Sequence, residues 1–219
     1  SLEVLRQLAA ADSRVKVITL RRNFGQTAAI AAGIDHATGD VIVPLDADGE
    51  NDPADIPALL AKLAEGYDIV SGWRQDRWLD DSWRRRWTSQ VANRLISRVS
   101  GVPLHDSGCT LKAYRAEVIK GVRLYGEMHR FIPALAAWQG ARITELPVRY
   151  QPRRFGASKY GLERVLKVLL DLVTLKFLND YSAKPIYFFG KVGLWSLLAS
   201  LATFGLAVYF KITGQKDFV

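Results

Sequence analysis

Apolar and polar positions follow two different periods along residues 1–150. Short apolar runs rich in β-branched residues are typical of buried strands, and stretches with apolar residues three and four apart are typical of helices. The predicted strands are residues 15–20, 41–45, 67–72, 110–114 and 143–146. The predicted helices are residues 2–11, 27–37, 56–63, 83–98 and 127–139. Their alternation predicts an α/β fold with a mostly parallel, doubly wound sheet and right-handed crossovers.

The pattern changes toward the C-terminus, where residues 192–210 contain no formally charged side chain. A helix there is ~28 Å long at ~1.5 Å per residue, close to the thickness of a bilayer's hydrocarbon core. A buried core helix is the alternative, but one so long and uncharged on every side is unusual. The segment is therefore predicted to span a membrane, with Lys191 and Lys211 at its ends.

A further helix, predicted at residues 162–178, carries a wide apolar face and a polar stripe. Such a helix either lies in the membrane interface or packs on the sheet, and its closeness to the predicted span favours the interface. These patterns divide the chain into four parts. They are an α/β domain at residues 1–160, an interface helix region at 161–184, a transmembrane helix at 185–211 and a tail at 212–219.

The chain has 219 residues, a net charge of +8 and a pI near 9.7. This balance indicates polyanionic partners such as nucleic acid, anionic lipid or a phosphorylated substrate. Nucleic acid would explain the charge but neither the apolar span nor an acidic strand end, so the sequence predicts no nucleic-acid partner. The single cysteine excludes an intrachain disulfide, and its spacing from the three histidines argues against a zinc site.

Three acidic residues spaced two apart, Asp46, Asp48 and Glu50, directly follow the second predicted strand. In open α/β sheets, ligands bind at the carboxyl ends of strands. Carboxylates crowded at such an end repel one another unless a cation offsets their charge, and oxygen ligands suit Mg²⁺ or Mn²⁺. A solvated acidic turn is the alternative. Because the residues follow a buried strand, the sequence favours the metal site.

Arginine-rich segments provide candidates for phosphate binding, each with a solvated surface residue as the alternative. Arg22 lies in the loop after the first predicted strand, and Arg130 lies in the opening turn of a predicted helix; neither interpretation is favoured for them. Arg86 belongs to arginines interleaved with tryptophan, where the predicted span favours a lipid phosphate. A basic, glycine-containing loop at residues 152–160 supplies Arg153, Arg154 and Lys159.

Asp106 lies in a loop, residues 101–109, that is predicted from its glycine and proline content. Its carboxylate could act as a general base or bind substrate hydroxyl groups. A turn-forming role, in which the side chain bonds to its own backbone, is nearly as well supported.

Five segments resemble family 2 glycosyltransferases of the GT-A fold, specifically the polyprenyl-phosphate glycosyltransferases related to dolichol-phosphate mannose synthase. The segments are Arg-Asn-Phe-Gly-Gln at residues 22–26, Asp-Ala-Asp-Gly-Glu-Asn-Asp-Pro at 46–53, Ser-Gly-Trp-Arg at 71–74, His-Asp-Ser-Gly-Cys at 105–109 and Pro-Arg-Arg-Phe-Gly-Ala-Ser-Lys-Tyr at 152–160. Each is a weak match alone. In the family's order and followed by an apolar helix, they form a specific set that covers most of the chain from residue 15 onward.

The resemblance implies a membrane-anchored, inverting enzyme that moves a sugar from a nucleotide diphosphate sugar to a polyprenyl phosphate. It implies that Asp46 and Asp48 hold Mg²⁺ or Mn²⁺ on the donor's diphosphate, with Glu50 as a further metal ligand. Asp48 and Asp106 are the expected catalytic residues, and Asp106 is expected to orient an acceptor that is already an anion at pH 7. The expected donor-binding residues are Arg22, Asp46, Gly72 and Arg74. The expected residues for the acceptor phosphate are Arg86, Arg130, Arg153, Arg154, Ser158 and Lys159.

Two features depart from the family pattern. Relatives begin with a strand and acidic loops that hold the nucleotide, upstream of the segments found here, and they often have a pair of membrane helices. The chain is therefore expected to be a fragment, and a catalytically inactive membrane-anchored scaffold of the same fold is the alternative. A processive polysaccharide synthase is disfavoured because the sequence lacks a Gln-x-x-Arg-Trp motif and further spans. The basic domain is expected to face the cytoplasm, and a homo-oligomer is possible.

Overall fold

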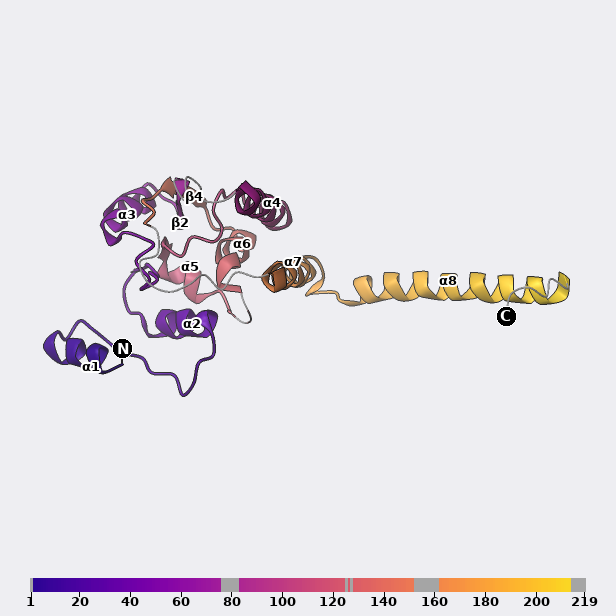
Figure 1. Ribbon diagram of the computed structural model, residues 1–219, viewed down its shortest axis with the longest axis horizontal. Coiled ribbons are helices and arrows are strands. Elements are labelled where there is room, and N and C mark those ends of the chain that lie inside the picture. Colours follow the sequence, from indigo (N-terminus) through magenta and orange to yellow (C-terminus); the bar gives the residue numbers. More distant parts are fainter. Residues whose placement is uncertain (1, 76–82, 125, 127, 152–161, 214–219) are drawn as a thin grey trace. The chain divides into compact units, whose positions relative to one another are not determined.

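A four-stranded sheet organises the chain, of which the computed structural model describes residues 2–75, 83–124, 126, 128–151 and 162–213. The sheet belongs to the first of two compact units, Ser1–Leu172 (Figure 1). Strand β3 runs antiparallel to both β1 and β2, and β2 runs parallel to β4. Strands β1, β2 and β4 therefore share one direction. In spatial order the strands are β1 (Val41–Ile42), β3 (Lys112–Arg115), β2 (Ile69–Trp73) and β4 (Ile143–Pro147).

The predicted α/β class is confirmed, but the described sheet is mixed rather than mostly parallel in its pairing. Three strands share a direction as expected. Strand β3 lies between β1 and β2, however, so two of the three strand pairs are antiparallel. The apolar pattern at residues 110–114 correctly predicted an extended segment. It could not reveal the direction of that strand, because side chains alternate between the two faces whichever way a strand runs.

The strand predicted at residues 15–20 is wrong, because the structure assigns no strand there. None of the described strands pairs with this segment. Ile18 and Leu20 are each 40% exposed. A strand requires a neighbour for its backbone N–H and C=O groups, so partly alternating apolar residues are not sufficient.

The five predicted helices of this unit are present close to their predicted positions, and the short helix α5 was not predicted. At the acidic segment, the carboxylate of Asp52 accepts a hydrogen bond from the backbone N–H of Ala54 at 2.9 Å. The short helix η1 (Pro53–Asp55) then begins with a proline, whose fixed φ suits the first helical position. Gly66, at a φ of 103°, lies just beyond the end of the next helix, where glycine is favoured. The α-helices are α1 (Leu2–Ala11), α2 (Gln26–His36), α3 (Ile56–Ala64), α4 (Trp83–Ser100), α5 (Ala116–Lys120) and α6 (Ile132–Trp138).

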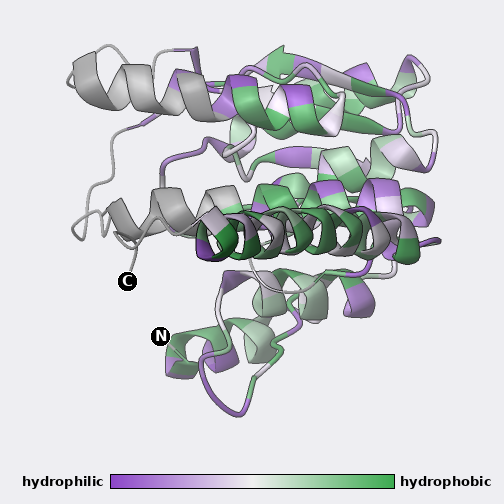
Figure 2. Ribbon diagram, turned by 90° about the vertical axis from the view of Figure 1, so that its right-hand side faces the viewer, coloured by the Kyte–Doolittle hydropathy of each residue, from purple (hydrophilic) through white to green (hydrophobic). Residues whose placement is uncertain are grey.

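Helices cover both faces of the sheet, and each face packs against them through a separate apolar cluster (Figure 2, hydrophobic residues in green). On one face, Ile69 and Tyr114 pack with residues of α2, α5 and α6. On the other face, Val70 packs with Leu59 and Leu63 of α3. Because successive strand residues point to opposite faces, β2 belongs to both clusters. The first two residues of β2 are thereby packed from both sides.

The second compact unit, Val173–Val219, contains the end of α7 (Leu162–Tyr181) and the whole of α8 (Ile186–Thr213). Ring contacts between Phe177 and Phe188, with centroids 5.4 Å apart, join the two helices. Among the described helices, α8 alone is long and apolar enough to cross a membrane, and the apolar part of its 28 residues is not buried in the structure. The apolar helix predicted near the C-terminus is therefore present and somewhat longer than expected.

Candidate active site

The carboxyl ends of β1, β2 and β4 lie at one edge of the sheet, because these strands share a direction. Strand β3 runs the opposite way, so the loop that precedes it reaches the same edge. This topology brings together Asp46 after β1, Arg74 after β2, and Asp106 in the loop before β3. The edge is where ligands bind in open α/β sheets, as expected from the sequence.

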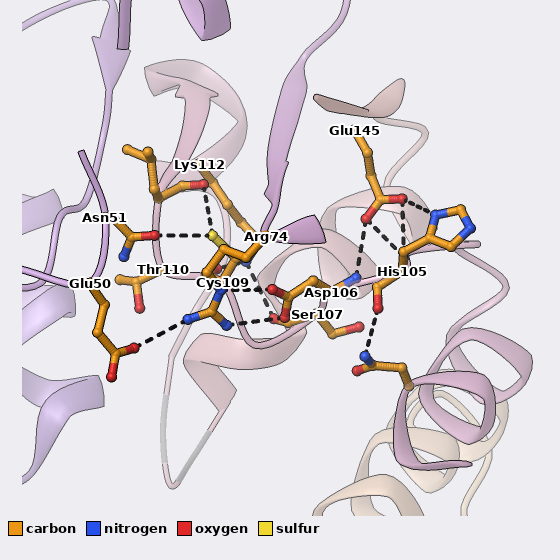
Figure 3. Close-up of polar contacts among 12 residues, drawn as sticks. Glu50, Asn51, Arg74, His105, Asp106, Ser107, Cys109, Thr110, Lys112 and Glu145 are labelled. Atoms are coloured by element: carbon orange, nitrogen blue, oxygen red, sulfur yellow. Dashed lines mark hydrogen bonds and ion pairs between the residues drawn. The ribbon is translucent and has the colours of Figure 1, made fainter. Parts of the chain in front are cut away.

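Arg74 and Asp106 form a buried, bidentate ion pair (Figure 3). The guanidinium donates from Nε to Oδ2 at 2.7 Å and from Nη2 to Oδ1 at 3.1 Å. Arg74 is 4% exposed and Asp106 is 5% exposed. Nη1 of the same arginine lies 3.4 Å from Oε2 of Glu50. Arg74 therefore links the acidic segment after β1 to the loop before β3.

The electrostatic setting of Arg74 keeps it charged. Burial opposes the charge, but the attraction of Asp106, with smaller contributions from Cys109 and Glu50, outweighs it and raises the pKa of Arg74. A bidentate pair between a guanidinium and a carboxylate also fixes the plane of both groups. The site thus contains a permanent cation in a set orientation.

Neutral groups donate hydrogen bonds to the carboxylates of Asp46 and Asp48. The carboxylate of Asp46 accepts from Nε2 of Gln26 at 3.0 Å and from Oγ1 of Thr110 at 2.6 Å. Oδ1 of Asp48 accepts from the backbone N–H of Glu50 at 3.1 Å. These donors set the direction of each carboxylate but do not offset its charge.

The residues of the acidic segment fit a metal ion only in part. Within the described residues, no three histidine, cysteine, aspartate or glutamate side chains gather as a metal site, so the expected group of three carboxylates is not present. Glu50 faces Arg74 at 3.4 Å. Mg²⁺, however, usually takes one or two carboxylates and completes its shell with water and substrate phosphates. Asp46 and Asp48 fit that smaller requirement.

Glu145, in β4, holds the loop that carries Asp106. Its carboxylate accepts from the backbone N–H of His105 at 2.8 Å and from that of Asp106 at 3.4 Å. It also contacts Nδ1 of His105 at 2.7 Å. The imidazole stacks on Trp73 of β2, with ring centroids 4.3 Å apart and planes at 17°. The loop is therefore tied to the ends of two neighbouring strands.

Lys112 and Cys109 are buried in the same region (Figure 3). Nζ of Lys112 donates to the carbonyl oxygen of Ser107 at 3.3 Å and to that of Cys109. Sγ of Cys109 lies 3.6 Å from Oδ1 of Asn51. Burial lowers the pKa of Lys112 and raises the pKa of Cys109, because each charged form loses hydration. The Cys109 thiol is therefore protected in the folded chain.

Gly72 is required by packing at this point of β2. Its backbone N–H donates to the carbonyl oxygen of Leu111 at 3.0 Å. A Cβ atom added at this glycine would lie 2.7 Å from the same oxygen and 3.1 Å from Sγ of Cys109. The residue therefore lets β2 approach the segment before β3 closely. Its predicted contact with the donor stays a prediction.

The other predicted phosphate-binding residues lie at several places in the chain. The guanidinium of Arg22 lies 4.6 Å from the ring centre of Phe24, in the loop before α2. Arg130 is half-buried in the short helix η3 (Met128–Phe131). Arg86 belongs to α4, but its side chain lies outside the described part of the structure. Also outside the described residues are Arg153, Arg154, Ser158 and Lys159.

The sequence interpretation missed four side chains that shape this site: Gln26, Thr110, Lys112 and Glu145. Gln26 lies inside one of the segments that resemble the family. Lys112 and Glu145 are charged residues within predicted apolar strands, and lysine and glutamate are rarely buried unless paired. The charge of Lys112 and Glu145 within an apolar strand pattern is therefore the sequence signal that could have identified these two residues. Thr110 carries no comparable signal in the sequence.

Two curated relatives share most of this chain. A dodecaprenyl-phosphate galacturonate synthase from Rhizobium johnstonii is 48% identical over 183 residues, covering 82% of this chain and 54% of that protein. An undecaprenyl-phosphate 4-deoxy-4-formamido-L-arabinose transferase from Edwardsiella ictaluri is 43% identical over 193 residues, covering 88% and 58%. The chain thus spans just over half the length of these curated relatives.

Solved structures show a similar fold. Glucosyl-3-phosphoglycerate synthase from Mycobacterium tuberculosis, in complex with Mn²⁺, UDP-glucose and phosphoglyceric acid, aligns with a TM-score of 0.54 at 16% identity, over 78% of this chain and 58% of that chain. The GT-A-like architecture expected from the sequence is thereby confirmed. The family described as Glycosyl transferase family 2 matches residues 1–123, more than half of the 219 residues. The chain therefore belongs to glycosyl transferase family 2.

Proposed function

We propose that the protein is a membrane-anchored, inverting glycosyltransferase that moves a sugar from a nucleotide diphosphate sugar to a polyprenyl phosphate. Membership of the family supports sugar transfer, and the names of both relatives specify a polyprenyl phosphate. The observation that carries the proposal is the buried pair of Arg74 and Asp106, linked through Glu50 to the acidic segment. A fixed cation beside oriented carboxylates is complementary to a diphosphate and its metal ion.

The donor side is proposed to centre on Asp46 and Asp48, which would hold Mg²⁺ or Mn²⁺ against the diphosphate. When bound, such an ion stabilises the charge that develops on the leaving group. Arg74 offers a planar, permanently charged guanidinium that matches phosphate oxygens. Arg22 and Gly72 complete the proposed donor contacts. Glu50, 3.4 Å from Arg74, orients the arginine in this proposal.

The acceptor phosphate needs little help from a base. The second pKa of a phosphate monoester is about 6, so the acceptor is largely an anion at pH 7. Asp106 is therefore proposed to orient the acceptor while it holds Arg74, and a single displacement by the phosphate inverts the reacting carbon of the sugar. The residues proposed to bind that phosphate are Arg86, Arg130, Arg153, Arg154, Ser158 and Lys159.

The membrane is proposed as the place of the reaction, because a polyprenyl phosphate resides in the bilayer. Helix α8, which is long and apolar enough to cross a membrane and whose apolar part is not buried, would anchor the chain there. Helix α7 precedes it and would lie in the interface. The basic first unit would face the cytoplasm, where positive charge is retained.

Transfer can be measured with the full chain in membranes that contain Mn²⁺ and polyprenyl phosphate. Radiolabelled nucleotide sugars are supplied one at a time, and the label is followed into an organic-extractable, acid-labile lipid. We expect transfer from one donor class, and we expect Asp48→Asn to lower it by about a hundredfold or more, because charge on the leaving group is then poorly stabilised. Asp35→Asn is the matched control, since Asp35 is exposed on α2.

Two results would contradict the proposal. If no nucleotide sugar gives a labelled lipid while the chain still binds Mn²⁺, the protein is a binding or scaffold protein of the same fold. If transfer occurs and Asp48→Asn retains it at the level of Asp35→Asn, the assignment of Asp48 to the metal is wrong.

A further inference from the structure

Three side chains form a polar row across the sheet next to the candidate active site. Ser71 of β2 is paired in register with Lys112 of β3 and with Glu145 of β4. Residues paired in this way project from the same face of a sheet. Two positions earlier, the same face carries Ile69 paired with Tyr114, both within the apolar core. Along this face of the sheet, apolar core residues are therefore replaced by polar residues two positions further along β2. The polar row lies toward the edge of the sheet where Asp106 is found.

The carboxylate at one end of this row binds N–H groups of the loop before β3. Oε1 and Oε2 of Glu145 lie 2.8 and 3.0 Å from the backbone N of His105, and Oε1 lies 3.4 Å from that of Asp106. Glu145 is a residue of β4, 39 positions from Asp106 in the sequence. A rigid strand thus fixes the start of the loop through its acceptors.

The ammonium at the other end of the row binds carbonyl groups of the same loop. Nζ of Lys112 donates to the carbonyl oxygens of Ser107 and Cys109, and the residue is 2% exposed. An ammonium group only donates, so carbonyl oxygens are its natural partners. Asp106 stands where the two sets of contacts meet. Its own N–H is the last one that Glu145 binds, and the carbonyl oxygen of Ser107, the next residue, is the first one that Lys112 binds.

We propose that Lys112 and Glu145 are positioning residues that together set the Asp106 carboxylate and, through it, Arg74. The inference rests on the proposed transfer reaction for its activity readout. A carboxylate holds the N–H groups at the beginning of the loop, and a buried ammonium holds the carbonyl groups further along it. The loop conformation is thereby fixed from two strands, and the bidentate geometry of Arg74 follows from it.

A contribution to positioning differs measurably from a contribution to stability. Lys112→Met keeps the length of the side chain but leaves the carbonyl oxygens of Ser107 and Cys109 without their donor, so some stability is lost in either case. A positioning role predicts that kcat/KM falls and that Cys109 becomes reactive while the chain remains folded. A purely structural role predicts that kcat/KM per folded chain is unchanged.

The chain contains its own reporter for the loop. Cys109 is the single cysteine, it is 1% exposed, and its carbonyl oxygen is one of the two that Lys112 binds. If Lys112 holds the loop, its replacement should expose the thiol to a maleimide reagent at neutral pH. This readout is independent of any donor or acceptor.

The experiment compares the full chain with Lys112→Met, Lys112→Arg and Lys120→Met in membranes. Lys120→Met is the matched control, because Lys120 also donates to a carbonyl oxygen, that of Ala37 at 2.7 Å, but is exposed on α5. For Lys112→Met we expect kcat/KM to fall by roughly tenfold to a hundredfold, as for small misplacements of catalytic groups. We expect maleimide modification of Cys109 to become at least about tenfold faster. Lys112→Arg should have a kcat/KM and a rate of Cys109 modification between those of Lys112→Met and the unmodified chain. Lys120→Met should change neither quantity.

The outcomes separate this inference from the proposed function. If the unmodified chain transfers no sugar, the proposed function fails, while modification of Cys109 in Lys112→Met still decides whether Lys112 holds the loop. If the unmodified chain is active and Lys112→Met matches it in kcat/KM and in thiol modification, the inference is overturned. If Lys112→Met does not fold, Glu145→Gln is subjected to the same two measurements. Unchanged values for that variant overturn the inference equally.

Discussion

Two carboxylates at the same edge of the sheet have opposite electrostatic settings. Asp106 is 5% exposed and is held by two charged hydrogen bonds from Arg74. Asp46 is half-buried, and its hydrogen bonds within the described residues come from the neutral side chains of Gln26 and Thr110. Within the part of the chain that the structure describes, Asp106 is therefore paired with a cation, whereas Asp46 is oriented by neutral donors.

This difference indicates how the two parts of the site would work. A buried charge must be paired within the protein, since desolvation makes an unpaired one costly. The ion pair of Arg74 and Asp106 is thus preorganised: its geometry is set before any ligand binds. The carboxylates of Asp46 and Asp48 are oriented by hydrogen bonds from neutral groups, and the proposed reaction adds a divalent cation and a diphosphate to them.

Among the substitutions that test this difference between Asp106 and Asp46, Arg74→Met is expected to have the largest effect on stability and on transfer activity. The substitution removes two charged hydrogen bonds from the buried carboxylate of Asp106, and removing one partner of a buried pair typically costs about 3–5 kcal/mol of folding free energy. Thermal denaturation of the detergent-solubilised chain measures the loss. Transfer activity should disappear with it, because the fixed cation of the site is removed.

Arg149→Met is the control for the arginine. Arg149 also contacts two carboxylates, Asp52 at 3.1 Å and Asp55 at 2.8 Å, but its side chain is 58% exposed. Solvent screens such a pair, so its removal should shift the melting temperature far less than Arg74→Met. Equal shifts for the two variants would show that burial does not distinguish the pair at the active site.

A smaller effect is expected from Gly72→Ala, which disturbs the strand leading to Arg74. The added Cβ would lie 2.7 Å from the carbonyl oxygen of Leu111. Because that oxygen belongs to backbone, the strands must separate, and overpacking of this kind typically costs about 1–3 kcal/mol. Gly33→Ala is the control: its Cβ meets nothing within 4 Å, and alanine favours the helix α2. A melting temperature unchanged by Gly72→Ala would contradict the packing role.

The elements of the fold were largely predictable from sequence, because their signals are local. Helical spacing of apolar residues located α1 and α3, and Asp52 with Pro53 marked the start of η1. The insertion of β3 between β1 and β2 was not predictable, because direction and order of strands depend on contacts between distant residues. The failed strand at residues 15–20 has the same cause: its pattern is local, but pairing is not.

For the candidate site, too, the sequence predicted which residues take part but not how they contact one another. The motifs located Asp46, Arg74 and Asp106, and the topology placed them at one edge as expected. The motifs could not show that Arg74 pairs with Asp106, since the two residues are 32 positions apart and the pair depends on the loop before β3. They also could not show that Glu50 faces Arg74 at 3.4 Å, which depends on the turn after Asp48.

The smallest effect is expected from Thr110→Val, which tests the neutral setting of Asp46. Oγ1 of Thr110 donates to Oδ2 of Asp46 at 2.6 Å, and valine keeps the shape of the side chain without that donor. The free energy of unfolding should fall by about 1 kcal/mol, less than the roughly 1.5–3 kcal/mol usual for a hydrogen bond to a charged group, because water can reach the half-buried carboxylate of Asp46. If Asp46 holds the metal ion, a less oriented carboxylate should raise the Mn²⁺ concentration for half-maximal transfer by about three- to fivefold.

Thr203→Val is the matched control for that variant, because Oγ1 of Thr203 bonds only to backbone oxygens of α8, at 2.9 Å and 3.1 Å. Its Mn²⁺ dependence should equal that of the unmodified chain. A raised Mn²⁺ requirement in Thr110→Val with a melting temperature lowered by only a few degrees would place the effect on the carboxylate itself. An unchanged Mn²⁺ requirement would mean that the hydrogen bond from Thr110 does not prepare Asp46 for a cation, and the contrast between Asp46 and Asp106 would then concern folding alone.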